Sequence, residues 1–425
     1  MNKIKASQVF TPGTIPNYTY NERKEIDLEE TLQEELEYGG KIILVTGPTK
    51  IGKTVLVRKC LPEEKLVFIQ PEDLREGIIE EVIASLINIP SSESNILRST
   101  NKVDSEVGVK AELSIGQTFL QLFKAKFTAS ASIKGLTGRE NEVTQEYKKN
   151  LLRETTKYLI KKEYILVFDD FHYLTPAEQT EIIHKLKPFL LDNLHVCIIL
   201  IPNRGQDVVK AEKDMDARID NIKIPQWDNK ELEFIPEEGF KKLNVNLPRK
   251  VIDSFVENSF KNPYLMQEIC AQFCRTHKIK EQYDTTFVIN AETINLVNVY
   301  SKLPTTNDIL LHNLKEGKLT KGKQRGLYEM KDGSKLDLYQ IILKGLAKVG
   351  HEEDVSIKTF VNVINTLRHT TEREIRRSDI VSTLKKMVEI CKEISPSEPA
   401  LDYNADTEKI IMNDPFFRFG VRWQI

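Results

Sequence analysis

Residues 41–54 read KIILVTGPTKIGKT, and this stretch decides the fold. Its first six residues form an apolar run with the length and composition of a buried strand. The next eight residues match the pattern GxxxxGK[ST] at every position, and residues 55–59 continue as a helix by pattern. A chance glycine turn would not explain why the strand, the helix and all signature residues occur together. The stretch therefore predicts a loop that binds phosphate groups.

The glycines of this loop let the backbone turn until its N–H groups converge on a phosphate, and the helix directs its positive end to the same place. We expect Lys53 to reach the β and γ phosphates and the Thr54 hydroxyl to bind Mg²⁺. The predicted cofactors are thus ATP and Mg²⁺. The residues expected to bind the nucleotide here are Gly47, Pro48, Thr49, Lys50, Ile51, Gly52, Lys53, Thr54 and Val55.

A second strand is expected to carry the acidic group that such a loop needs for its metal. Residues 164–168 (YILVF) are typical of a central parallel strand, and Asp169 and Asp170 follow them. We expect this strand to neighbour the first, with Asp169 at the magnesium ion and Asp170 orienting the attacking water. Asp170 has an alternative role as the cap of the next turn. Since aspartate is shorter than the glutamate of fast P-loop hydrolases, we expect slow turnover.

A third strand is predicted at residues 195–201, and Pro202, Asn203 and Arg204 follow it. Adjacent strands of a parallel sheet end at the same edge. We therefore expect the side chains of both Asn203 and Arg204 near the γ-phosphate, where one of them senses whether that group is present.

Arg218 precedes another expected strand at residues 221–225. At the rim of a nucleotide domain, an arginine can reach the nucleotide of a neighbouring subunit as an arginine finger. An ion pair with Asp214 or Asp216 on the surface is the other interpretation, and the sequence leaves both open.

Together these residues resemble the STAND and origin-recognition-like branch of the AAA+ ATPases. The likeness rests on the loop 47–54, the acidic strand 164–170, Arg204, and the turn 261–265 (KNPYL). It implies an α/β parallel-sheet core of the P-loop NTPase type, a helical lid and a C-terminal winged-helix domain. It also implies that Arg204 is a nucleotide sensor and that Pro263 contacts adenine. The turn reads Lys-Asn-Pro where the family has Gly-x-Pro.

The resemblance extends to the N-terminus, where residues 11–20 and Arg23 are similar to the strip that lines the adenine pocket in such ATPases. A second lid arginine of the sensor-2 kind is not recognisable. The predicted domains are a nucleotide-binding core at 1–228, a helical lid at 229–300, a Lys/Gly-rich linker at 301–335 and a winged-helix domain at 336–425.

An insertion is expected in the core near residues 98–140, which are rich in Ser, Thr, Gly and Lys. Apolar and polar residues alternate at 107–115 and 123–133, and this pattern predicts the two strands of a hairpin. Lysines and a glutamate on the polar positions suit a solvated face, so packing on its own domain is favoured over assembly into an oligomeric sheet or a membrane barrel.

Three helices followed by a two-stranded wing are predicted in the C-terminal domain, at residues 336–349, 355–367, 376–390, 401–403 and 409–412. Duplex DNA is a possible partner through the basic side chains of the third helix and the wing. These side chains are Arg376, Arg377, Lys385, Lys386 and Lys409. Nearby acidic residues dilute this charge, so packing against protein is the alternative use.

Composition narrows the class of protein. The 61 basic and 63 acidic side chains leave a net charge of −2, so any nucleic-acid binding must come from a local patch. No apolar run approaches the ~18 residues of a membrane helix, and we expect a cytoplasmic protein without a membrane partner. Five cysteines without CxxC spacing fit neither a disulfide framework nor a zinc ribbon. Cys270, Cys274 and His277 are predicted to be packing residues.

The leading hypothesis is a slowly hydrolysing ATPase that acts as a molecular switch. It would control a homo-oligomer or a separate effector protein, with bacterial antiviral defence as a setting. The alternative is a DNA-binding ATPase of the origin-recognition or transposition-helper type that uses its winged helix. A third hypothesis is a P-loop that binds nucleotide structurally without turnover.

Overall fold

The computed structural model describes residues 3–75, 79–86, 120–121, 124, 140–201, 218–303, 308–318, 325–350, 352, 354–396 and 398–425. The chain divides into two compact units. We call the unit of Glu22–Pro48 and Lys53–Pro225 the core unit. The C-terminal unit holds Met1–Asn21, Thr49–Gly52 and Gln226–Ile425.

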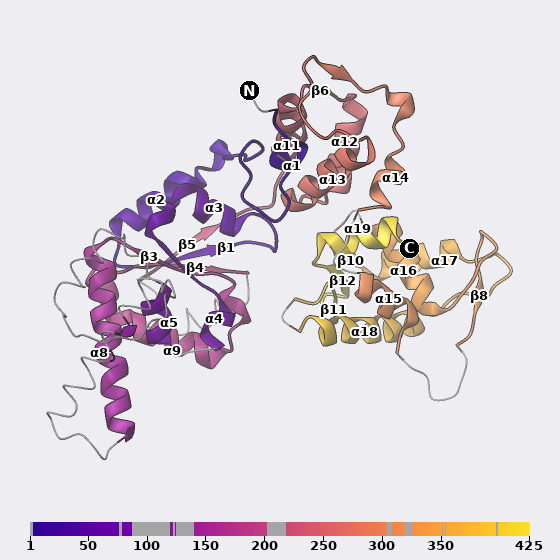
Figure 1. The fold of residues 1–425 in the computed structure, drawn as a ribbon. Helices are drawn as coiled ribbons and strands as arrows, with labels where there is room; N and C mark the ends of the chain where they lie inside the picture. Colours follow the sequence, from indigo (N-terminus) through magenta and orange to yellow (C-terminus); the bar gives the residue numbers. More distant parts are fainter. Residues whose placement is uncertain are drawn as a thin grey trace, which may run out of the picture. The chain divides into compact units, whose positions relative to one another are not determined.

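A five-stranded sheet forms the centre of the core unit (Figure 1). All four neighbouring pairs are parallel, in the order β2-β3-β4-β1-β5. The strands are β1 (Ile42–Thr46), β2 (Leu66–Ile69), β3 (Ile165–Phe168), β4 (His195–Leu200) and β5 (Ile219–Lys223). The predicted α/β class with a parallel sheet is confirmed, and β5 begins two residues before the strand expected at 221–225.

The lateral order of the strands corrects one expectation. The acidic strand β3 does not neighbour β1, because β4 pairs with both of them and lies between them. Strand composition predicts that a segment is a buried strand, but it does not say which strand it pairs with. Since every strand runs parallel, the carboxyl ends of β1 and β3 still lie at one edge of the sheet.

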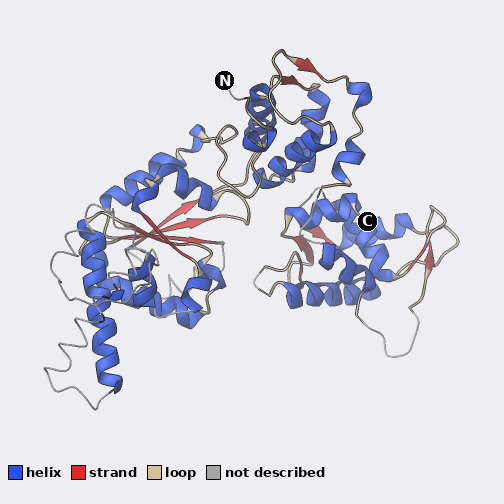
Figure 2. Ribbon diagram, viewed as in Figure 1, coloured by secondary structure: helices blue, strands red, loops and turns tan. Residues whose placement is uncertain are grey.

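Helices cover both faces of this sheet (Figure 2), and every residue of β1 and β3 is buried. On one face, apolar side chains of α5, α8 and α9 form a single hydrophobic cluster with the strands. The α-helices of the core unit whose bounds the structure describes are α2 (Leu28–Tyr38), α3 (Lys53–Cys60), α4 (Pro71–Arg75), α5 (Ile79–Leu86), α8 (Glu140–Lys161) and α9 (Pro176–Leu190).

Most of the insertion expected near residues 98–140 lies outside the described residues. Leu120, Gln121 and Lys124 are described, and all three are helical. Lys124, near the start of the second expected strand, is therefore not in a strand.

The first part of the C-terminal unit is the predicted helical region. Asp228 and Glu231 form a reciprocal capping box at the start of α11, and Asn262 caps α13, whose first residue is Pro263. The elements are α1 (Ala6–Val9), α11 (Asn229–Lys242), β6 (Val245–Asn246), α12 (Arg249–Asn258), α13 (Pro263–Thr276), β7 (Phe287–Val288) and α14 (Leu296–Tyr300).

The rest of the unit builds a second hydrophobic core from helices and a three-stranded antiparallel sheet of order β10-β12-β11. Leucines of α15 join this core, although α15 lies within the stretch 301–335 expected to be a linker. The elements are α15 (Asp308–Glu316), β8 (Tyr328–Glu329), β9 (Lys335–Leu336), α16 (Leu338–Val349), β10 (Asp354–Ser356), α17 (Ile357–Leu367), α18 (Arg377–Ile394), β11 (Leu401–Asn404), β12 (Lys409–Met412) and α19 (Pro415–Trp423).

Within the described ranges, none of the helices is both long enough and apolar enough to span a bilayer.

Candidate nucleotide-binding site

The glycine-rich loop connects β1 to α3, the arrangement that its sequence predicts. Two of its residues have left-handed backbone: Lys50 at φ +56° and Gly52 at φ +104°. A Cβ atom at position 52 would meet no atom within 4 Å, so glycine is needed there for its left-handed backbone rather than for space.

Lys53 is the first residue of α3, and only 7% of its surface is exposed. Its Nζ donates to the carbonyl oxygens of Gly47 at 2.9 Å and Pro48 at 2.8 Å. These carbonyls compensate the ammonium for lost water, because a buried charge needs hydrogen-bond partners. The lysine thus extends back across the start of the loop.

The structure brings Thr54 and Asp169 together. The Thr54 hydroxyl donates to Oδ2 of Asp169 at 2.9 Å and lies 3.2 Å from Oδ1, and the backbone N–H of Asp170 donates to Oδ1 at 3.0 Å. A hydroxyl and a carboxylate are the hard oxygen ligands that Mg²⁺ prefers.

The donor set fits magnesium in number as well as kind. No group of three or more His, Cys, Asp or Glu side chains in the described part of the chain is arranged to hold a metal ion. Mg²⁺ usually takes one or two protein carboxylates and completes its shell with phosphate and water. One carboxylate beside one hydroxyl matches this need.

Burial raises the pKa of Asp169 above its ordinary value, because the charged form loses solvation. The hydrogen bonds from Thr54 and the Asp170 N–H, and the positive charge of Lys53, act in the opposite direction without cancelling the effect. Asp169 is therefore a carboxylate whose charge the fold leaves partly uncompensated.

Asp170 differs from its neighbour in being exposed and in having left-handed backbone, at φ +52°. It precedes the short helix η3 (Phe171–Tyr173), but its side chain makes no capping hydrogen bond there. Partial loss of solvation and then the charge of Asp169 raise the pKa of Asp170. Water screens this repulsion because the side chain is exposed. Its carboxylate thus sits in solvent beside the Thr54–Asp169 pair.

Of the two predicted arginines, the structure describes only Arg218. Arg204, like Asn203, lies outside the described residues. Arg218 directly precedes β5, and the pairing of β5 with β1 puts it level with Lys41 at the amino edge of the sheet. The loop follows the carboxyl end of β1, so five strand residues, about 16 Å, separate the two edges. Arg218 therefore belongs to the opposite side of its own sheet.

The tip of the loop, Thr49–Gly52, contacts side chains of the C-terminal unit to which it belongs. The indole Nε1 of Trp227 donates to the carbonyl of Ile51 at 3.1 Å, and Nδ2 of Asn262 to the carbonyl of Thr49 at 3.4 Å. Sequence reasoning missed both contacts. The position of Asn262, directly before a proline that starts a helix, indicates a helix cap but not a contact with the loop. No sequence pattern indicates the contact of Trp227.

The Lys50 side chain also meets aromatic rings of the C-terminal unit. Its Nζ lies 4.0 Å from the ring centroid of Phe416 and 5.7 Å from that of Tyr264. The two rings pack edge to face, with centroids 5.3 Å apart. Such contacts between a cation and a ring are favourable, so the loop tip is held by its side chain as well as its backbone.

Pro263 is buried at the start of α13, and residues of the N-terminal strip pack on the same helix. The backbone N–H of Thr11 donates to Gln267 at 3.2 Å, and the Gln267 amide donates to the Thr19 hydroxyl at 2.6 Å. Arg23 belongs to the core unit instead. The strip and Pro263 are thus neighbours on one helix, and their contact with adenine stays a prediction.

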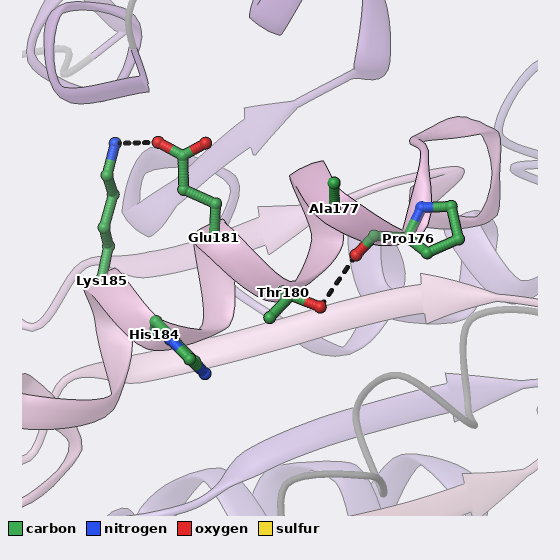
Figure 3. A pocket seen from close by; sticks show the side chains of 6 residues that line it. All are labelled: Pro176, Ala177, Thr180, Glu181, His184 and Lys185. Carbon is green, nitrogen blue, oxygen red and sulfur yellow. Dashed lines mark hydrogen bonds and ion pairs between the residues drawn. The ribbon is translucent and has the colours of Figure 1, made fainter.

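The described residues that line a surface depression elsewhere in the core unit all belong to α9 (Figure 3). Glu181 and Lys185 point toward each other in an ion pair of 2.7 Å, and Lys185 also contacts the buried Glu80 at 2.9 Å. None of the predicted site residues that the structure describes lines this depression. Its lining residues are Pro176, Ala177, Thr180, Glu181, His184 and Lys185.

No protein-family model and no curated protein matches the sequence. Among solved structures, a Walker-type ATPase of Pyrococcus abyssi aligns at 16% identity, covering 94% of this chain and 97% of its own, with a TM-score of 0.46. The Aeropyrum pernix Orc1 protein, solved in complex with DNA, aligns at 11% identity over 100% and 98% of the two chains, with a TM-score of 0.42. Cdc6p from Pyrobaculum aerophilum gives 12% identity, 100% and 99% coverage, and a TM-score of 0.37.

Proposed function

We propose that this chain is an AAA+-like ATPase that binds ATP with Mg²⁺ on the loop 47–54 and hydrolyses it slowly. The observation that carries the proposal is the contact between Thr54 and Asp169, 2.9 Å long, beside a lysine that spans the loop. A P-loop without a role in phosphate binding has no need to bring a hydroxyl, a carboxylate and a buried ammonium to one sheet edge.

Each residue has a distinct role in this proposal. Lys53 and the loop N–H groups bind the β and γ phosphates. Thr54 and Asp169 would hold Mg²⁺, directly or through water, and the bound ion neutralises phosphate charge. Asp170 orients the water that attacks the γ-phosphorus, which releases ADP and inorganic phosphate. The short, solvent-exposed Asp170 side chain supports slow turnover, because an imprecisely held water reacts slowly.

The proposed output is a switch in conformation or assembly. The chain passes from one compact unit to the other within the loop, so a change in loop conformation is transmitted covalently to both. Nucleotide binding would in this way control a homo-oligomer. Among the described residues, no feature identifies a separate effector or an antiviral setting.

Isothermal titration calorimetry with MgATP and a phosphate-release assay test this function. Lys53→Ala should lose most of the ATP affinity, about 10- to 100-fold, because it removes a charge-assisted contact. Lys59→Ala, which removes a lysine from the same helix, is the matched control and should bind like the wild type. If the wild type and Lys53→Ala show the same weak binding, the proposal is wrong.

A second candidate function is ATP-controlled binding of duplex DNA by the last domain. Helix α18 and the three-stranded sheet support the expected winged helix, and Lys385 and Lys386 are exposed on α18. Two other basic residues pair with acids, Arg377 with Glu408 and Lys409 with Asp354. Such exposed pairs are weak, so they reduce the local charge without preventing phosphate contacts.

DNA affinity measured between 50 and 200 mM salt tests this candidate. The double variant Lys385→Ala, Lys386→Ala removes both charges and should lower the affinity for DNA. The slope of log affinity against log salt concentration should become shallower by about two. A double variant at the exposed Lys241 and Lys242 of α11 controls for net charge. Equal effects of both double variants would show that α18 is not a specific DNA-binding surface.

A further inference from the structure

We propose that Trp227 and Asn262 are positioning residues for the phosphate groups. By holding the carbonyls of Ile51 and Thr49, they aim the N–H groups of Gly52 and Lys50 at the nucleotide. This inference rests on the proposed ATP-binding function and adds to it two side chains that lie far from the loop in the sequence.

Trp227 is suited to this role because an indole N–H can only donate a hydrogen bond. Trp227 is 8% exposed, and the carbonyl it contacts belongs to Ile51, which is 3% exposed. A buried carbonyl must find a donor, so this bond of 3.1 Å determines the direction in which the carbonyl points.

Asn262 serves two partners at once. Its Oδ1 accepts from the backbone N–H of Leu265 at 2.9 Å, as the cap of α13. This bond orients the amide so that Nδ2, the donor, faces the carbonyl of Thr49 at 3.4 Å. The side chain is 3% exposed, so few other orientations are open to it.

The geometry of the peptide bond connects these contacts to phosphate binding. In a trans peptide unit, the C=O and the following N–H point in opposite directions. When the carbonyl of Thr49 points toward Asn262, the N–H of Lys50 therefore points away from Asn262. In the same way, the carbonyl of Ile51 points toward Trp227 and the N–H of Gly52 points away from it. Lys50 and Gly52 are the two left-handed residues of the loop, where the backbone most needs outside support.

The test uses the full chain and two conservative substitutions. Trp227→Phe keeps an aromatic ring and removes the donor, while Asn262→Ser keeps a neutral helix cap and no longer reaches Thr49. The chain offers a matched control for each. Trp423→Phe removes an indole bond to Asn258 (2.8 Å), and Asn295→Ser alters the cap of α14. Affinities for MgATP, MgADP and adenosine are measured by calorimetry, and folding by thermal unfolding.

We expect Trp227→Phe and Asn262→Ser each to bind MgATP and MgADP about 3- to 10-fold more weakly than its control. A loss of this size is the effect of one lost hydrogen bond. Adenosine, which has no phosphate, should bind all four variants alike. A loss that is equal for adenosine and ATP, or no loss relative to the controls, overturns the inference. If Trp227→Phe does not fold, Asn262→Ser alone decides.

The result also separates this inference from the function on which it rests. If the wild type binds MgATP and Lys53→Ala does not, the proposed ATP site is supported. Trp227→Phe and Asn262→Ser then test the positioning role alone. If the wild type does not bind MgATP at all, both proposals fall.

Discussion

The Thr54 hydroxyl donates to Asp169 at 2.9 Å, although 115 positions of sequence separate the two residues. They meet because β1 and β3 are parallel strands of one sheet, and both residues follow the carboxyl ends of these strands. The intervening strand β4 does not keep them apart. This pair is the part of the site on which the first prediction depends.

Asp169→Asn and Asp170→Asn should have different effects. Asp169→Asn removes a charge that Mg²⁺ needs, so the magnesium-dependent part of ATP affinity and the hydrolysis should both be lost. Asp170→Asn should keep the affinity and lower the turnover by about 100-fold, the contribution of a group that orients or activates water. Calorimetry with and without Mg²⁺ and a phosphate-release assay check both. Identical behaviour of the two variants would contradict the division of roles.

The raised pKa of Asp169 predicts a pH dependence of stability in the absence of nucleotide. When folding raises the pKa of an acid, the fold favours the neutral form, so this contribution is present below the unfolded pKa and is lost as pH rises through the folded pKa. Asp169→Asn should therefore unfold like the wild type near pH 3.5 and be more stable at pH 7.

Urea denaturation at the two pH values measures this difference. Asp192→Asn, which removes an exposed carboxylate from the same unit, controls for the change in net charge. A gain in the free energy of unfolding that is the same at both pH values would show that burial of the Asp169 charge is not its cause.

Arg218 gives a prediction about assembly. Because it lies at the amino edge of its own sheet, it can act as an arginine finger only on the nucleotide of another subunit. Arg218→Ala should then keep its ATP affinity and lose hydrolysis by about 100-fold or more. Mixing it with Asp169→Asn, which has an intact Arg218 and an inactive site, should restore activity. Without such restoration, the ion-pair interpretation is favoured.

The cysteines should be unreactive in the folded protein. All five are buried and free, and burial raises the pKa of the Cys60, Cys274 and Cys391 thiols to about 12. A thiol reacts as the thiolate, so Ellman's reagent at pH 8 should find almost none before denaturation and all five after it. One rapidly reacting thiol in the native protein would contradict this packing role.

Helix α19 should be essential for the stability of the second hydrophobic core of the C-terminal unit. Phe417 is fully buried in this core, so Phe417→Ala should lower the free energy of unfolding by about 3–5 kcal/mol. Phe287→Ala makes the same change at a side chain that is 43% exposed, and should cost less than about 1 kcal/mol. Chemical denaturation followed by circular dichroism compares them, and equal losses would count against the assigned core.

Local patterns were enough to predict much of the fold. The apolar run before Gly47 is β1, the run before Asp169 is β3, and the helix after Lys53 is α3. These elements depend on short-range rules of burial, turn geometry and helix capping, which a sequence displays directly. The strand pairing was beyond such rules, because any apolar run can pair with any other until packing energy selects one arrangement.

By itself, the amino-acid sequence determined that a glycine-rich loop lies between a strand and a helix and that two carboxylates end another strand. Only the tertiary structure decided that β4 separates these strands, that Arg218 lies at the far edge, and that Trp227 and Asn262 hold the loop tip. The reason is that backbone conformation responds to neighbours in the chain, whereas a hydrogen bond across 176 or 213 positions exists only after the whole domain has packed.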